Sequence, residues 1–292
     1  MKIAGADRYS IESFLGKGPS GIVYKAWDSG FNRHIAIKIA HKGTGHFIAE
    51  NRLVGSLVHR NIVTIYKVES ILDVSYISME YVKGLDLRAF CKKGLLLKPQ
   101  VVIEIMIEVL KGLFHGHGKG FIHRNIKPSN IILSENGVPK ILDFGIARMT
   151  GKNLRTGFLG APDYMSPEQL KDKPATMKSD IFSLGCVLYE MLKGEKPFRA
   201  ESQYTVITKI IDNNPEPLGD TLPCKETLQT IINKALSKDP DARYQGCSDF
   251  ALDLSKALGL LNKREQLNKP SILRFLTERV NVFKTIAAPT RN

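Results

Sequence analysis

The sequence predicts an α+β fold in which a strand-rich first part precedes a helical second part. β-branched and aromatic residues on both sides of a glycine turn indicate two strands between residues 9 and 27, and a third apolar strand is predicted at 34–40. Apolar residues recur at helical spacing over residues 99–119, which predicts an amphipathic helix. The 292 residues, 43% of them hydrophobic, suffice for one two-lobed domain or two small ones.

The charge balance is basic, with 42 Lys and Arg residues against 29 Asp and Glu and a net charge of +13. This favours acidic partners such as nucleotides, anionic proteins or a membrane surface, without choosing among them. The most apolar stretch, 101–110, is interrupted by Glu104 and Glu108, so we predict no membrane span. No apolar signal-peptide core opens the chain. Four scattered cysteines without metal-site spacing predict reduced thiols and a cytoplasmic location: Cys91, Cys186, Cys224 and Cys247.

A glycine-rich turn joins the first two predicted strands. Gly16, Gly18 and Gly21 follow a G-x-G-x-x-G pattern, which carries little weight alone because dinucleotide-binding folds use it too. Those folds continue with a helix, whereas strand-forming residues follow here at once. We therefore predict a hairpin flap whose backbone N–H groups can approach phosphates, with an ordinary glycine-rich hairpin as the alternative.

The most informative stretch is H-R-N-I-K-P-S-N at residues 123–130, followed by D-F-G at 143–145. It resembles the catalytic loop and metal-binding triplet of the protein kinases. Roughly ten motif positions in the same order extend this resemblance over residues 9–260. The catalytic loop resembles the serine/threonine version, and the segments at 165–168 and 212–217 look most like bacterial serine/threonine kinases.

The resemblance implies the two-lobed protein kinase fold. A small β-rich N-lobe is expected at about 9–82 and a larger helical C-lobe at about 83–260. Residues 261–292 lie outside the resemblance and form a tail whose opening is basic. A linker, a docking tail and a solvated helix all remain open for it.

The resemblance also implies an ATP site. Lys38 matches the lysine that contacts the α- and β-phosphates, and Glu50 matches its ion-pair partner. Only twelve residues separate the two, which is short for the family, so a clipped helix would support this pair less well. Met79 corresponds to the gatekeeper beside the adenine and Asp86 to a ribose ligand. The other positions implied to contact the nucleotide, besides the three glycines, are Val23, Ala36, Glu80, Val82 and Ile132.

The same comparison assigns the chemistry. Asn130 and Asp143 are expected to hold Mg²⁺ through oxygen ligands, which magnesium prefers, and Lys127 to neutralise charge on the transferred group. Asn125 stands where the family carries its catalytic aspartate, and its neutral amide cannot usefully take a proton. Losing such a group typically costs about 10²–10⁴ in rate. Ala161 replaces the threonine that bridges the catalytic aspartate and the lysine.

Further family positions read as structural anchors. Asp180 is implied to tie the catalytic loop to a central helix, and Arg243 to pair with Glu168. Thr150 and Thr156 are candidate phosphorylation sites, with ordinary polar loop residues as the alternative.

Two function classes therefore stay open. One is a serine/threonine protein kinase that transfers a phosphoryl group from ATP to protein, with transfer strongly impaired by Asn125 and Ala161, whether these are natural or introduced by substitution. The other is a natural ATP-binding pseudokinase that regulates or scaffolds a protein partner. Whether the chain is an enzyme is thus left open. The sequence identifies no substrate or partner, and we predict no nucleic-acid partner.

Overall fold

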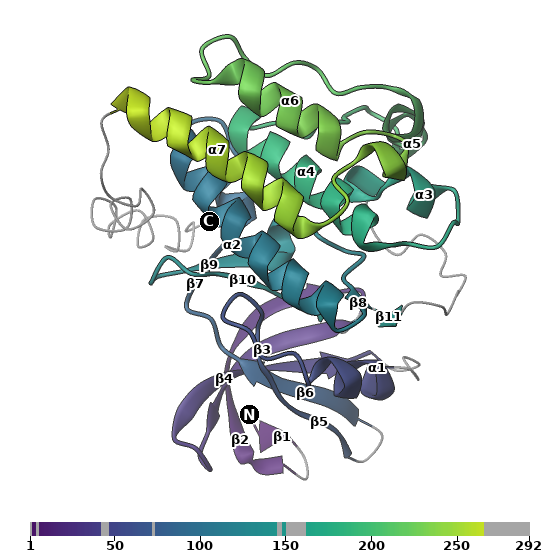
Figure 1. The fold of residues 1–292 in the computed structure, drawn as a ribbon. Coiled ribbons are helices and arrows are strands. Elements are labelled where there is room, and N and C mark those ends of the chain that lie inside the picture. Colours follow the sequence, from purple (N-terminus) through teal and green to yellow (C-terminus); the bar gives the residue numbers. More distant parts are fainter. Residues whose placement is uncertain are drawn as a thin grey trace.

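The computed structural model describes residues 2–3, 6–41, 47–71, 74–144, 148–149 and 162–265. It confirms the predicted α+β fold with two lobes, a β-sheet N-lobe and a larger helical C-lobe (Figure 1). Across these ranges, no helix is both long enough and apolar enough to cross a membrane.

The N-lobe is built on one antiparallel sheet with the strand order β1-β2-β3-β4-β6-β5. Successive side chains of a strand point to opposite faces, so the sheet separates two sets of residues. One face carries a small core of Tyr9, Ala26, Ile35, Ile37 and Tyr76. The elements of this lobe are β1 (Lys2–Ile3), β2 (Ala6–Gly18), β3 (Gly21–Asp28), β4 (Arg33–Ala40), α1 (Phe47–Val54), β5 (Ile65–Ile71) and β6 (Val74–Glu80).

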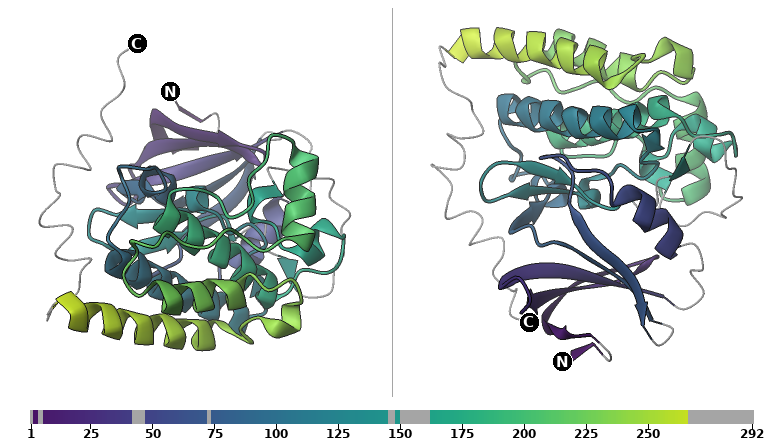
Figure 2. Two further views of the ribbon diagram at one scale, coloured as in Figure 1. Left: turned by 90° about the horizontal axis from the view of Figure 1, so that it is seen from above. Right: turned by 60° about the horizontal axis from the view of Figure 1, so that its bottom comes forward.

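The C-lobe is organised around α4 (Met177–Lys193). Every residue of α4 from Ser179 to Leu192 is buried, as expected for a helix enclosed by others. The helix predicted at 99–119 is α2 (Pro99–Gly118), which packs against both α4 and α7 (Cys247–Glu265); Figure 2 shows α7 alongside it. Its predicted apolar stripe is buried throughout, at Val102, Ile105, Met106, Val109, Leu110 and Leu113.

The remaining C-lobe elements are short. Two small sheets, β10-β9-β7 and β11-β8, lie between the helices and the N-lobe (Figure 1). Their strands are β7 (Gly84–Asp86), β8 (Phe121–Ile122), β9 (Ile131–Ser134), β10 (Pro139–Ile141) and β11 (Arg148–Met149). The other helices are α3 (Pro167–Leu170), α5 (Gln203–Asp212) and α6 (Lys225–Ala235), with 3-10 turns η1 (Leu87–Phe90), η2 (Pro128–Asn130), η4 (Pro162–Tyr164) and η5 (Pro240–Ala242).

The lobes are joined by the chain at 81–83 and by hydrogen bonds farther along. The loop after α1 meets β10, where the Val63 N–H donates to the Ile141 carbonyl at 3.0 Å and the Ile141 N–H donates to the Asn61 carbonyl at 2.8 Å. The buried amide of Asn61 also donates through Nδ2 to the Pro139 carbonyl at 3.0 Å. These bonds hold the N-lobe sheet against the strands that follow the catalytic loop.

Candidate functional site

The three glycines of the β2–β3 hairpin have different surroundings. Gly18 pairs with Gly21 across a two-residue turn. A Cβ added at Gly16 or Gly18 would meet nothing within 4 Å, whereas one at Gly21 would lie 2.1 Å from the Ile39 carbonyl oxygen of β4. Gly21 is therefore required for packing within the sheet, and Gly16 and Gly18 leave open space beside the hairpin backbone.

One face of the N-lobe sheet gathers the residues expected to contact the nucleotide. Val23 on β3 lies opposite Lys38 on β4, and Ala36 on β4 lies opposite Met79 on β6. Cross-strand neighbours share a face, as do residues two apart along one strand. Val23, Ala36, Lys38 and Met79 therefore lie together, on the face opposite to the small N-lobe core.

Lys38 connects this face to the C-lobe. Its side chain is almost fully buried, and its Nζ donates to Asp143 Oδ1 at 2.7 Å. Burial alone would raise the pKa of Asp143, but the charge and hydrogen bond of Lys38 outweigh it and the pKa is lowered. Asp143 therefore stays ionised at neutral pH. Its backbone has a φ of 59°, a left-handed conformation that is costly for a non-glycine residue.

Glu50 belongs to α1, which has eight residues. The side chain of Glu50 lies outside the described residues, so the expected Lys38–Glu50 ion pair stays a prediction. The described partner of Lys38 is Asp143 of the C-lobe.

Asp180 holds the catalytic loop in place, as expected from the sequence. This fully buried carboxylate accepts hydrogen bonds from the backbone N–H groups of His123 and Arg124, at 2.8 and 2.7 Å. His117 Nε2 lies 2.8 Å from it. Arg124 has a φ of 65°, so three hydrogen bonds converge where the backbone turns through a strained conformation.

His123 links the loop to the residue before Asp143. Burial lowers the pKa of this fully enclosed imidazole, which is therefore neutral. Its Nε2 lies 2.7 Å from the Leu142 carbonyl, and its Nδ1 lies 3.2 Å from the Asn125 backbone nitrogen. These partners fit a tautomer in which Nε2 carries the proton and Nδ1 accepts from the Asn125 N–H.

The candidate catalytic and metal-binding side chains belong to this loop or follow it closely in the chain. The Asn130 Nδ2 donates to the Asn125 carbonyl at 2.8 Å, which leaves Oδ1 as the acceptor of the Asn130 side chain. Burial lowers the pKa of Lys127, and the charges of Arg88 and Lys38 lower it further against the opposing charge of Asp143. Lys38, Lys127 and Asp143 thus lie within electrostatic range of one another.

Two residues at the connection between the lobes already have partners. The Glu80 carboxylate pairs with Lys140 at 2.8 Å, and it lies 3.3 Å from the Thr64 backbone nitrogen. Asp86 accepts from the Arg88 backbone at 3.0 Å and forms a bidentate pair with the Arg88 guanidinium at 2.8 and 2.7 Å. A nucleotide would therefore have to share or displace the Asp86–Arg88 pair in order to use Asp86.

The remaining predicted positions are placed as follows. Ile132 on β9 lies opposite Asp86 on β7, and Val82 lies in the connection between β6 and β7. Gly145, Thr150, Thr156 and Ala161 lie outside the described residues. Within the described part of the chain, no group of three or more His, Cys, Asp or Glu side chains could hold a metal ion. A Mg²⁺ ion here would thus depend on Asp143, Asn130 and the phosphates of a nucleotide.

The predicted pairing of Glu168 with Arg243 is confirmed. The two buried side chains form a bidentate pair with both distances at 2.8 Å, and Ser179 adds a third hydrogen bond to the Glu168 carboxylate. Burial raises the pKa of Glu168, but Arg243 outweighs it and the pKa is lowered. This ion pair therefore holds α3 against the loop that precedes α7 within the C-lobe.

Sequence reasoning missed how Phe144 is seated. This buried ring lies edge-on to His123, with centroids 4.7 Å apart. A Cβ added at Gly116 of α2 would lie 2.7 Å from Phe144 Cε1. A glycine within a long amphipathic helix was the available signal, because such a glycine often marks close packing.

A model of the protein kinase domain matches residues 9–251 of the chain. The chain belongs to the protein kinase family. Members of this family use ATP and Mg²⁺ in general, and the two lobes described above are those of the kinase fold.

Bacterial serine/threonine kinases are among its relatives. The chain is 35% identical over 268 residues to a probable serine/threonine-protein kinase of Streptomyces coelicolor, covering 86% of this chain and 40% of that protein. It is 36% identical over 261 residues to the serine/threonine-protein kinase PrkC of Bacillus subtilis, with coverage of 86% and 40%. For the serine/threonine-protein kinase PknB of Mycolicibacterium smegmatis the identity is 34% over 269 residues, with coverage of 85% and 43%. The chain thus spans about two fifths of the length of these kinases.

Proposed function

We propose that this serine/threonine kinase domain binds Mg-ATP between its lobes and that its transfer of phosphoryl groups to protein is strongly reduced by Asn125 and Ala161. The 2.7 Å contact between Lys38 and Asp143 carries the proposal, because it brings the lysine of the N-lobe sheet to the carboxylate that follows the catalytic loop. Two groups of opposite charge meet where phosphates and a metal ion would have to be held together.

At the adenine end, the apolar side chains on the sheet face would enclose the base. Val23, Ala36 and Met79 would pack against it from the N-lobe, and Ile132 from the C-lobe. The Glu80 carboxylate is ion-paired with Lys140. Glu80 and Val82 would therefore contact the edge of the adenine through their backbone groups. Asp86 would reach the ribose by sharing its bonds with Arg88.

At the phosphate end, Gly16 and Gly18 leave the hairpin backbone open to a phosphate, while Gly21 holds the hairpin on β4. Lys38 would hold the α- and β-phosphates, with Glu50 as its second partner. Asp143 and the Oδ1 of Asn130 would hold Mg²⁺, which when bound neutralises charge on the phosphates.

Asn125 determines how fast the phosphoryl group can be transferred. An asparagine can donate or accept a hydrogen bond to orient an acceptor hydroxyl, but it can neither usefully take the hydroxyl proton nor add negative charge. Lys127 can still neutralise charge on the transferred group. We therefore expect binding and positioning to persist with a slow transfer step.

A second candidate function is a pseudokinase that binds Mg-ATP and regulates or scaffolds a protein partner. Asn125 favours it, because the loop around this residue is fully supported by His123, Asn130 and Asp180 although the acidic group is replaced. Such a protein would use the nucleotide as a structural or switching element.

We propose further that the kinase domain extends over residues 9–260, with its lobes meeting near residues 82 and 83. The tail at 261–292 would then begin inside α7, which continues to Glu265. A cytoplasmic location is also proposed, since all four cysteines are buried free thiols.

Transfer of radiolabel from ATP to the protein itself or to a general protein substrate tests the enzymatic proposal. Asn125→Asp should raise the rate by about 10²–10⁴. Asn125→Asp combined with Ala161→Thr should add little more, because residues that act as a unit are non-additive. Adding Lys38→Met should abolish the gain. No gain in the double variant, with Mg-ATP binding intact, would leave the pseudokinase function instead.

A further inference from the structure

Four exposed cations lie on the C-lobe beside the catalytic loop, and we call them the acceptor-side cluster: Arg88, Lys93, Lys196 and Arg199. Their exposed side-chain fractions run from 39% for Lys196 to 73% for Lys93. The carboxylates that pair with them are recessed, from 14% exposed for Asp163 to 26% for Asp86. Within these ion pairs, the cation is therefore the more exposed partner.

The cluster adjoins Asn125 through a chain of contacts. Arg88 lies in η1, which packs on η2 of the catalytic loop, and its charge helps to lower the pKa of Lys127 after burial. On the other side, Gln169 Nε2 donates to the Arg124 carbonyl at 3.0 Å, which fixes the segment 162–170 beside the loop. A partner seated on the cluster would thus lie next to the position of the acceptor hydroxyl.

Lys196 is fixed to that segment. Its Nζ forms an ion pair with Asp163 at 3.0 Å and lies 5.8 Å from the centre of the Tyr164 ring. Tyr164 in turn donates its hydroxyl to Glu190 at 2.6 Å. Burial raises the pKa of Glu190, although the Tyr164 bond opposes this. Glu190 is thus covered and already bonded, so it adds little negative potential to the surface.

A single recessed carboxylate contacts two of the four cations in the cluster. Glu195 pairs with Lys93 at 2.5 Å and with Arg199 at 2.9 Å. Lys93 also packs beside Gly194, where an added Cβ would lie 3.3 Å from its Cγ. Two cations therefore share one anion, which leaves an excess of positive charge at this edge.

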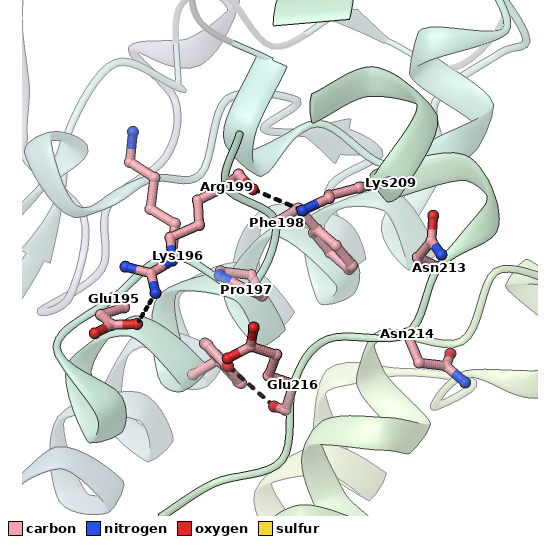
Figure 3. A pocket seen from close by; sticks show the side chains of 10 residues that line it. Glu195, Lys196, Pro197, Phe198, Arg199, Lys209, Asn213, Asn214 and Glu216 are labelled. Carbon is pink, nitrogen blue, oxygen red and sulfur yellow. Dashed lines mark hydrogen bonds and ion pairs between the residues drawn. The ribbon is translucent and has the colours of Figure 1, made fainter. Parts of the chain in front are cut away.

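The loop that carries Lys196 and Arg199 is also the wall of a pocket of about 200 Å³ (Figure 3). In the figure, Lys196 extends away from the pocket and Glu195 lies beside Arg199. Lys209 Nζ donates to the Arg199 carbonyl at 3.0 Å, and the Tyr189 hydroxyl donates to the Glu216 carbonyl at 3.0 Å. The Lys209 bond ties the loop to α5, which reduces the ordering cost of binding a partner.

We propose that the acceptor-side cluster binds an acidic segment of a protein partner, with Asp and Glu side chains of that segment contacting Arg88, Lys196 and Arg199. The assignment of an acceptor position rests on the proposed kinase function, whereas binding of the segment requires no transfer. The same surface would select acidic substrates in the enzymatic case and an acidic docking segment in the pseudokinase case.

Fluorescence anisotropy with labelled peptides tests the proposal. The probe is a short peptide with a central threonine flanked by Asp and Glu, and its comparison peptide carries Asn and Gln at those positions. The acidic peptide should bind at least about tenfold more tightly at low salt, and added salt should weaken its binding. Charge reversal in Lys196→Glu should weaken it by about tenfold.

A matched control places the same charge change elsewhere. Lys256 on α7 is also exposed and also paired with an aspartate, Asp253, so Lys256→Glu should leave peptide affinity within about twofold. The Mg-ATP-induced shift in melting temperature should be the same in every variant, which separates this test from that of the nucleotide site. Equal affinity for the two peptides, equal weakening by Lys256→Glu, or preferential binding of a single-stranded oligonucleotide would overturn the proposal.

Discussion

The two halves of the candidate site are held in different ways. The C-lobe half rests on buried, multiply bonded anchors: Asp180 accepts from two backbone N–H groups, and Glu168 and Arg243 form a bidentate pair. The N-lobe half reaches the phosphate end of the C-lobe site through the ion pair between Lys38 and Asp143, and it meets the C-lobe at the connection between the lobes through the pair between Glu80 and Lys140. The catalytic loop is thus built before any nucleotide arrives, whereas Lys38 meets Asp143 through a contact that a nucleotide and metal would share.

The largest expected effect comes from breaking a C-lobe anchor. Arg243→Ala leaves the Glu168 carboxylate buried beside only Ser179 and should cost about 3–5 kcal/mol of unfolding free energy, measured by urea denaturation. Arg243→Met combined with Glu168→Leu removes both charges and should recover most of that loss. An Arg243→Ala loss below about 1 kcal/mol would mean that this half is not anchored as described.

A smaller effect is expected where Phe144 packs against α2. Gly116→Ala places a methyl group 2.7 Å from the ring and should destabilise by about 1–3 kcal/mol. Phe144→Leu should relieve this clash, so the two changes together should cost less than the sum of the single changes.

Gly118 provides the control for Gly116. It ends the same helix, and a Cβ added there would meet nothing within 4 Å. Gly118→Ala should therefore leave stability unchanged or raise it by up to about 1 kcal/mol, because alanine loses less backbone freedom than glycine on folding. Equal changes in stability for Gly116→Ala and Gly118→Ala would contradict the described packing of Phe144 against Gly116.

The dependence of stability on pH tests the pair between Lys38 and Asp143. The pKa of Asp143 is lowered in the folded chain, so this carboxylate contributes stability above its unfolded pKa, near 4, and that stability is lost as the pH falls through the folded value. Lys38→Met removes the strongest influence that lowers the pKa of Asp143, while burial still raises it. The stability difference between the parent chain and this variant should therefore be larger at about pH 7 than at about pH 4.

Urea denaturation at both pH values measures this difference. Lys119→Met, which removes an exposed lysine at the end of α2, is the matched control and should show little dependence on pH. A difference between the parent chain and Lys38→Met that does not change with pH would show that the pair does not set the ionisation of Asp143.

Much of the fold could be predicted because the apolar residues recur at the spacing of helices and strands. The stripe of α2 and the strands of the hairpin follow from local spacing, and the apolar positions expected to be buried are buried. The positions of Asp180 and Arg243 could be predicted only through the resemblance to kinases, because their partners lie 57 and 75 residues away in the chain.

Other features depend on contacts that no local pattern encodes. The ion pair of Glu80 with Lys140 and the different roles of Gly16 and Gly21 follow from which strands lie close together. A one-letter motif treats the three glycines alike, whereas sheet packing gives Gly21 a steric role of its own. The acceptor-side cluster was equally hidden, since its members come from two distant stretches of the chain, 88–93 and 196–199.

The central claim is that Lys38 and Asp143 form the phosphate and metal end of a working nucleotide site, and thermal unfolding with ATP tests it most directly. A ligand at 100 times its dissociation constant stabilises by about 2.7 kcal/mol, a shift of roughly 2–4 °C for a domain of this order of size. The account predicts such a shift with ATP and Mg²⁺ together, its loss in Lys38→Met and its retention in Lys119→Met. No shift at saturating Mg-ATP in the parent chain, or an equal shift in Lys38→Met, would contradict it.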